Sequence, residues 1–199
     1  MTQRPEPLWP LFAELKTLDG VGPKTAQALE GLDGVAPRDL LFTLPHGVID
    51  RRPRETVLGA DLPGVVTVEV TVGRHMKPAQ KGRPYRIHVE DARSGFQLVF
   101  FHGREDYLSR VLPEGARRLV SGRVELFDGT AQMVHPDHVL PVDEVATLPA
   151  FEPVYPLTAG VTQKLMARAT ADALTMAPEL GEWIDGPLKA REGWPDWRD

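Results

Sequence analysis

The stretch LDGVGPKTAQAL, residues 18–29, contains glycine, lysine and threonine, the residue types that hold phosphate groups in nucleotide-binding loops. A loop of the form G-x-x-x-x-G-K-[ST] wraps phosphates with successive backbone N–H groups. Here Pro23 separates Gly22 from Lys24 and removes one of those N–H groups, and Thr17 stands where the first glycine should be. The apolar residues before the loop follow helical rather than strand spacing. The pattern therefore argues against ATP binding by this stretch.

A helix, a tight turn and a second helix account for the same residues. Gly20 and Gly22 permit backbone angles that other residues resist, and Pro23 suits the first position of a helix. Exposed N–H groups at the start of that helix suit an anion such as a DNA phosphate. The stretch resembles the helix-hairpin-helix element of DNA-binding proteins, with Lys24 as the candidate phosphate contact. An ordinary helical hairpin would have the same pattern.

A second candidate for phosphate binding lies in the middle of the chain. The net charge of the whole chain is −5, but residues 65–140 carry 11 basic against 9 acidic side chains, whereas residues 1–64 and 141–199 are both acidic. A run of cations with no acidic residue between them comprises Arg74, Lys77, Lys81, Arg83 and Arg86. Such a run can bind phosphates regardless of the total charge. A solvated loop that binds no ligand would have the same run of cations.

Other chemistry has little support. His135 and His138 flank Asp137, but a zinc site needs more ligands, so we expect no metal. The chain has no Cys, which excludes disulfides and thiolate chemistry. Its apolar content of 42% is enough for a core, and no apolar run approaches the roughly 18 residues of a membrane span. No Ser-His-Asp grouping or carboxylate pair follows from the spacing.

The elements that must position these residues change character along the chain. The first 45 residues have helical spacing, and Pro45 ends the last helix. From Val65 the period changes to two, which predicts a strand whose valines share one face. That inward set is Val66, Val68, Val70 and Val72. Further strands are predicted at 85–92, 96–102 and 117–127, with a helix at 104–112. Residues 130–140 are predicted to hold the fifth strand and its exit, with Pro136 indicating a turn at the end of that strand.

Two further signals complete the predicted architecture. Asp128 and Gly129 form a two-residue hairpin signal between the last two strands. A Pro-rich stretch follows the barrel, and a helix at 162–177 has Thr162 as its N-cap. Five strands with a helix between the third and fourth match the element order of an OB-fold barrel. We therefore predict an α+β protein, mainly β, with a five-stranded OB-fold barrel, an N-terminal helical hairpin segment and a C-terminal helix.

These elements divide the chain into three predicted domains. Residues 1–64 form the helical segment, residues 65–140 the barrel, and residues 141–199 a linker and helix. An OB-fold commonly binds oligonucleotides across strands two and three and the adjoining loops. The basic run falls in the loop between strands one and two, so position and charge agree.

Several segments together resemble one known family. In chain order they are LDGVGPKTAQAL, DLLFTLPHGVIDRR, VVTVEVTV, FFHGREDYL, VSGRVE, MVHPDH and PVYPLTAGVTQKLMARATADAL. This ordered set, which covers nearly all of the 199 residues, resembles the N-terminal region of RecG, a bacterial ATP-dependent helicase that remodels branched DNA. The resemblance implies a wedge domain, an OB-fold with helical additions. It also implies that this wedge meets the branch point of replication forks and Holliday junctions in recombination and repair, and splits parental from nascent strands.

The resemblance also assigns roles to aromatic residues after the third strand, where family wedges replace lost base stacking. Here the candidates are Phe101 and Tyr107, with Arg104 between them to hold a phosphate or stack on a base. Alternation places Phe100 and Phe101 on opposite faces, so one ring belongs to the core and the other to the barrel surface. The spacing from Phe101 to Tyr107 is longer than in the commoner family form, so Tyr107 packing against the barrel stays open.

Family likeness further implies two motor domains that supply ATP-driven pulling. No G-x-x-x-x-G-K-[ST] motif occurs here, so we expect a part of a longer protein that alone neither hydrolyses ATP nor unwinds DNA. ATP and Mg²⁺ are implied only for the motor domains, and no cofactor is expected in this chain. Expected partners are branched DNA with single-stranded segments and the motor domains of the same polypeptide. We expect a cytoplasmic, nucleoid-associated monomer; the alternative is an OB-fold that binds another protein.

Overall fold

The computed structural model describes residues 4–32, 34–78, 80 and 82–196, and the chain groups into two compact units. We name residues 48–152 the barrel unit, and residues 1–47 with 153–199 the helical unit. The two ends of the chain thus share one unit. The division into 1–64, 65–140 and 141–199 stays a prediction about domains.

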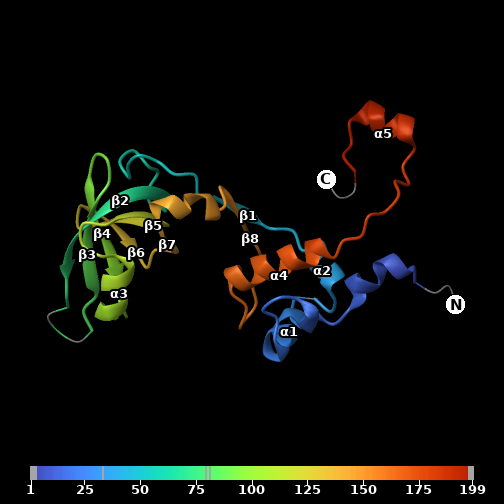
Figure 1. The fold of residues 1–199 in the computed structure, drawn as a ribbon, viewed down its shortest axis with the longest axis horizontal. Helices are drawn as coiled ribbons and strands as arrows, with labels where there is room; N and C mark the ends of the chain where they lie inside the picture. The colour runs from blue at the N-terminus through green and yellow to red at the C-terminus, as the bar shows by residue number, and fades with distance from the viewer. Residues whose placement is uncertain (1–3, 33, 79, 81, 197–199) are drawn as a thin grey trace. The chain divides into compact units, whose positions relative to one another are not determined.

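The barrel unit is a closed five-stranded barrel (Figure 1). Its strands are β2 (Gly64–Met76), β3 (Tyr85–Glu90), β4 (Gly95–Phe100), β5 (Arg117–Phe127) and β6 (Thr130–Val134). The strand order is β2-β3-β4-β6-β5, and β5 pairs back onto β2. Only β4 and β6 are parallel among these pairs. Helix α3 (Glu105–Val111) lies between the third and fourth barrel strands, so the predicted OB-fold order is confirmed.

The fifth predicted strand is divided in the structure. Strand β6 ends at Val134, and β7 (His138–Pro141) continues along β5 after a turn at His135, whose φ is 47°. Strand β5 pairs with β6 near its end and with β7 near its start. The 3-10 helix η3 (Val142–Thr147) follows. The left-handed backbone of His135 turns its side chain out of the regular alternation of the strand.

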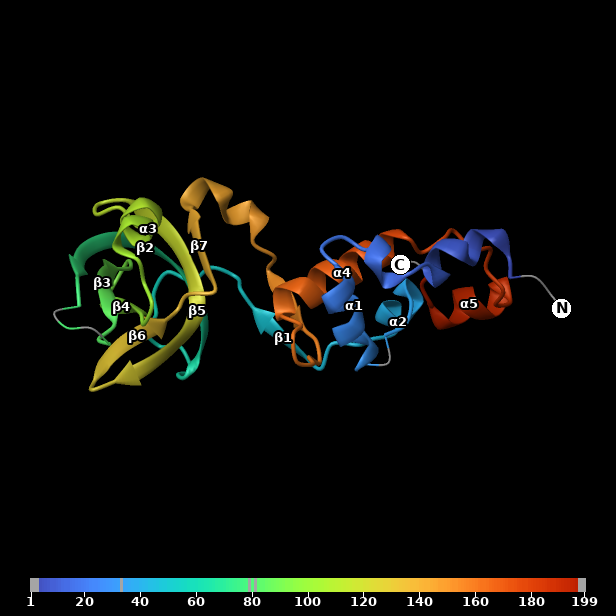
Figure 2. The same ribbon diagram turned by 90° about the horizontal axis from the view of Figure 1, so that it is seen from below.

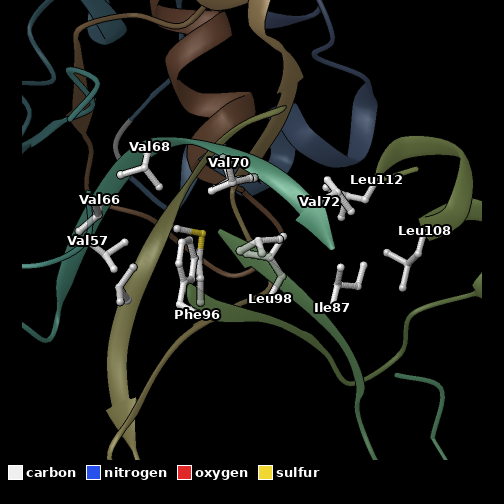
Figure 3. Packing of buried hydrophobic residues seen from close by; sticks show 14 of the residues in the cluster. Val57, Val66, Val68, Val70, Val72, Ile87, Phe96, Leu98, Leu108 and Leu112 are labelled. Carbon is white, nitrogen blue, oxygen red and sulfur yellow. The ribbon is translucent and has the colours of Figure 1, made fainter. Parts of the chain in front are cut away.

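The barrel closes around one apolar core, which Figure 3 shows at close range. The inward valines of β2 are 0–2% exposed, as the alternation predicted. Phe96 and Leu98 of β4 meet Ile87 of β3 in the same core. Leu108 and Leu112, from α3 and its C-terminal end, lie beside Val72 and Ile87 and cover one end of the barrel (Figure 3).

A polar network is also buried in the barrel unit. Arg51 is 3% exposed, and its guanidinium donates to Ser121 Oγ at 2.9 Å, to Asp137 Oδ2 at 3.1 Å and to Glu152. Ser121 also shares a 2.7 Å hydrogen bond with Thr67. Thr67 lies on the polar face of β2 and is nevertheless buried beneath this network. The partners satisfy the charge of the arginine, which makes its burial tolerable.

The helical unit contains short helices around a second core. Its elements are η1 (Glu6–Phe12), η2 (Leu15–Thr17), α1 (Pro23–Glu30), α2 (Pro37–Leu41), α4 (Gln163–Thr175) and α5 (Gly186–Glu192). Strands β1 (Gly47–Asp50) and β8 (Phe151–Val154) form a two-stranded sheet where the chain passes from one unit to the other (Figure 1). Figure 2 shows β1 in the second view. Residues Glu6–Phe12 form 3-10 rather than α-helix, because prolines such as Pro10 lack the N–H that an α-helix needs. A single 3-10 turn, η2, follows before the Gly-Pro turn.

Two predicted helix starts are confirmed in this unit. Pro23 is the first residue of α1, and Gly20 before it has a φ of 74°. The Thr162 hydroxyl accepts a hydrogen bond from the Leu165 N–H at 3.3 Å, so Thr162 caps α4. Met166, Ala169 and Ala173 on α4 are completely buried, and α4 packs against α2 in this core.

Candidate nucleic-acid interface

Phe101 stands at the end of β4 with its ring exposed. Phe100, the last residue of the strand, packs against the barrel core, whereas Phe101 is 53% exposed. The alternation of the strand explains this separation of two adjacent aromatic rings. Burial of Phe101 in the core is therefore ruled out, and its stacking role stays a prediction.

Tyr107 is equally exposed, on the outer side of α3. Its exposed fraction is 53%, while its neighbour Leu108 points into the core at 2%. The Arg110 guanidinium lies 5.7 Å from the centre of the Tyr107 ring. Tyr107 does not pack into the core, which leaves one face of its ring able to meet a ligand.

An open groove connects the basic loop with Phe101. Its lining residues are Pro78, Gln80, Gly82, Arg83, Phe101 and His102. The register of the barrel explains this neighbourhood, because Tyr85 of β3 pairs with Phe100 of β4. The loop that precedes Tyr85 must therefore lie beside the turn that follows Phe100. The structure thus joins Arg83 and Phe101, two predicted site residues from separate segments.

A second hollow adjoins the same turn. Its lining residues are Phe100, His102, Gly103, Arg104, Tyr107, Leu108, His135 and Pro136. Arg104 is exposed at the N-terminal end of α3, and it shares the hollow with Tyr107. Two predicted site residues thus meet here, and His102 lines both depressions.

The predicted cations of the basic run differ in their surroundings. Lys77 forms an ion pair with Glu105 at 2.5 Å, and this carboxylate raises the pKa of the lysine. Arg86 is half-buried and donates from Nη1 to Gln97 Oε1 at 2.7 Å. Arg74 and Arg83 are exposed. Lys81 lies outside the described residues.

Lys24 belongs to the helical unit, where it is exposed in the first turn of α1. The turn before this helix is tied to α4, because the Asp19 N–H donates to Asp172 Oδ2 at 2.8 Å. Arg168 of α4 also forms an ion pair with Asp19 at 3.6 Å. Two carboxylates near the turn oppose the binding of an anion. The phosphate contact of Lys24 stays a prediction.

His135 is the residue that spacing alone did not identify as part of this site. Its Nε2 accepts the N–H of Phe101 at 3.2 Å, and the two ring centres are 5.8 Å apart. The HPDH segment was weighed as a possible metal site and is part of the family resemblance, but neither assigned a role to His135; Asp137 pairs with Arg51. The parallel pairing of β4 and β6, which brings their C-terminal ends together, was the available signal. Within the described ranges, no group of His, Asp and Glu is arranged to hold a metal ion.

Comparisons with known proteins agree with this architecture. The model of a family described as the RecG wedge domain matches residues 14–177. An ATP-dependent DNA helicase RecG from Acidithiobacillus ferridurans is 26% identical over 197 residues, which cover 95% of this chain and 27% of that protein. Its counterpart from Escherichia coli K12 is 30% identical over 175 residues, covering 81% of this chain and 24% of that protein.

Structural similarity extends over the same region. A solved structure of RecG bound to a three-way DNA junction aligns with a TM-score of 0.72 at 23% identity, covering 91% of this chain and 25% of that one. The chain therefore spans about a quarter of the length of the curated relatives it matches. Among the residues that the structure describes, no helix is long and apolar enough to cross a membrane. Because the family model matches most of its length, the chain belongs to the RecG wedge domain family.

Proposed function

We propose that this chain binds branched DNA and acts as the strand-separating wedge of a RecG-type ATP-dependent helicase in recombination and repair. The observation that carries the proposal is the groove in which exposed Phe101 faces the basic loop through Arg83. Membership of the wedge family and the junction bound by a structurally similar RecG support it.

The chemistry of a branch point fits the two depressions at the turn after β4, which share His102 as a lining residue. Strand separation unstacks bases, and an exposed aromatic ring restores about 1–3 kcal/mol of stacking per base. Arginines close to that ring hold the phosphates of the same strand, and each such contact releases counterions. Tyr107 and Arg104 extend the surface over the second hollow. The proposed partner is therefore DNA with single-stranded segments at a junction.

The proposed activity divides between this chain and motor domains. The curated relatives are about four times as long as the matched region and are named ATP-dependent helicases. We propose that motor domains of the same polypeptide use ATP and Mg²⁺ to move the duplex, while the barrel unit divides it. The wedge itself then needs no cofactor, because stacking and phosphate binding use side chains alone.

Fluorescence anisotropy with a three-way forked DNA and a matched linear duplex, over a salt series, tests the proposal. Phe101→Ala is compared with wild type, and Phe127→Ala is the matched control. Phe127 is similarly exposed, at 59%, at the end of β5 in the same barrel. We expect wild type to prefer the fork and Phe101→Ala to lose about tenfold in fork affinity, as expected for one lost stacking contact.

The salt series separates DNA binding from other functions of a barrel. Binding through phosphates weakens steeply as salt rises, and Phe101→Ala should keep the same slope because it removes no charge. Equal and negligible binding of wild type to both DNAs would refute autonomous DNA recognition. The OB-fold would then remain a candidate for binding another protein. If Phe127→Ala lost as much fork preference as Phe101→Ala, the assignment of Phe101 as the stacking residue would be wrong.

A further inference from the structure

We infer that His135 is a positioning residue, which holds the Phe101 ring in the orientation that meets an unstacked base. The inference rests on the proposed function of Phe101. It starts from three features that converge on His135: a left-handed backbone, a hydrogen bond to the Phe101 backbone, and contact with two phenyl rings.

The backbone of His135 directs its side chain toward β4. Its N–H donates to the Val99 carbonyl at 2.9 Å, which extends the parallel pairing of β6 with β4 by one residue. Its φ of 47° is uncommon for a residue with a side chain. Two residues later, Asp137 accepts a hydrogen bond from the buried Arg51 guanidinium. The turn is thus held at both ends, and a strained conformation persists because its surroundings determine it.

The imidazole of His135 reaches both rings of the Phe100–Phe101 pair. The centre of the Phe100 ring lies 6.0 Å away in an edge-on arrangement, and that of Phe101 lies 5.8 Å away at a tilt of 36°. Both distances are within the range in which aromatic pairs stabilise one another. Phe100 is part of the barrel wall, so the imidazole connects the exposed ring to a fixed one.

The hydrogen bond to the Phe101 N–H fixes the backbone of the same residue. Phe101 lies one residue beyond β4, where the strand ladder no longer holds its N–H. His135 Nε2 accepts this N–H at 3.2 Å, which requires a ring nitrogen without a proton. A single side chain therefore orients both the backbone and the ring of Phe101. Such preorganisation lowers the cost of ordering the platform when DNA binds.

The variant His135→Asn tests the inference with the least disturbance. Asparagine tolerates a positive φ better than most residues, so the turn should persist while the imidazole is lost. Wild type, His135→Asn, Phe101→Ala and the double variant are compared by fork and duplex affinity over a salt series. His46→Asn, which removes an exposed imidazole from the helical unit, is the control. Hydrogen exchange of the Phe101 amide, followed by NMR without DNA, is the second readout.

If His135 positions Phe101, His135→Asn should lower the fork-to-duplex affinity ratio about fivefold. The salt slope should stay unchanged, since no phosphate contact is removed. The double variant should bind no more weakly than Phe101→Ala, because His135 acts through that ring. The Phe101 amide should exchange faster in His135→Asn, while the thermal midpoint stays near that of wild type.

Additive losses in the double variant would overturn the inference, because His135 would then contact DNA independently. An unchanged affinity ratio or an unchanged Phe101 amide exchange in His135→Asn would overturn it as well. The two proposals fail in different ways. If wild type shows no preference for the fork, the proposed function fails, and the amide exchange still decides whether His135 holds Phe101 in place.

Discussion

The barrel unit and the helical unit use their polar groups in opposite ways. In the barrel unit a closed set of strand ladders satisfies the backbone, so the loops after β2 and β4 leave Arg83 and Phe101 exposed. In the helical unit the turn before α1 is tied to α4, with the Asp19 N–H bound by Asp172. The loops of the barrel thus leave their side chains exposed, whereas the turn of the helical unit is held by a neighbouring helix.

The largest expected difference in stability is between two arginines, one in each unit. Arg51 in the barrel unit is buried among Ser121, Asp137 and Glu152, whereas Arg168 in the helical unit forms an exposed pair with Asp19. We expect Arg51→Met to lower the free energy of unfolding by about 3 kcal/mol, because it leaves carboxylates without their buried partner. Arg168→Met should cost about 0–1 kcal/mol.

Urea denaturation followed by circular dichroism measures both arginine variants, with hydrogen-exchange mass spectrometry to locate the loss. Faster exchange should concentrate in β2, β5 and β7 for Arg51→Met. A cost for Arg168→Met equal to that for Arg51→Met would mean that the helical unit depends on its charges as strongly as the barrel unit does.

A smaller effect is expected from a device that both units share, a carboxylate that accepts backbone N–H groups. Asp91 accepts those of Val57, Arg93 and Ser94 at 2.7–2.9 Å. Asp39 accepts only two, from Val35 and Ala36. We expect Asp91→Asn to cost about 2 kcal/mol, because one amide oxygen cannot replace both carboxylate oxygens that accept N–H groups. Asp39→Asn should cost about 1 kcal/mol, because one carboxylate oxygen accepts both N–H groups and an amide oxygen can take its place without the charge.

The pH dependence of these variants follows from the direction of their pKa shifts. Burial raises the pKa of Asp91, but the hydrogen bonds from Arg93, Val57 and Ser94 outweigh it, so the net pKa is lowered from 3.8. The stabilisation is complete above pH 3.8 and is lost as the pH falls through the lowered pKa of the folded state. Thermal midpoints of wild type and Asp91→Asn should converge below that pH. A gap that widens on acidification would contradict the assigned role of Asp91.

The smallest effect compares two glycines with positive φ. Gly20 in the helical unit has a φ of 74°, and a Cβ there would collide with the Arg168 guanidinium. Gly129 in the barrel unit has a φ of 73° but open space around it. Gly129→Ala should cost about 1 kcal/mol from backbone strain alone. Gly20→Ala should cost slightly more, because Arg168 must also move. Differential scanning calorimetry measures the stability of both variants. A larger loss for Gly129→Ala than for Gly20→Ala would mean that the turn before α1 is held less tightly than its contacts with α4 indicate.

Local patterns predicted much of the fold. The alternation of β2, the Asp128-Gly129 hairpin, with φ values of 49° and 73°, and the Thr162 cap all appear in the structure. Each depends on residues close together in sequence, so a local pattern suffices. The 3-10 helices before Gly20, the left-handed backbone of His135 and the strand β7 that follows it were not predicted. Both are departures from regular geometry, which periodicity alone does not detect.

For the candidate site, the sequence by itself determined three features. They are an aromatic residue near the end of a strand, a loop rich in cations and a Gly-Pro turn. It also placed Phe100 and Phe101 on opposite faces, because side chains alternate along any strand. Only the tertiary structure decided which of these residues meet. Arg83 lies beside Phe101 because β3 pairs with β4, and His135 reaches Phe101 because β6 runs parallel to β4. Strand pairing joins residues that are far apart along the chain, and its register comes from the closure of the whole barrel around one core.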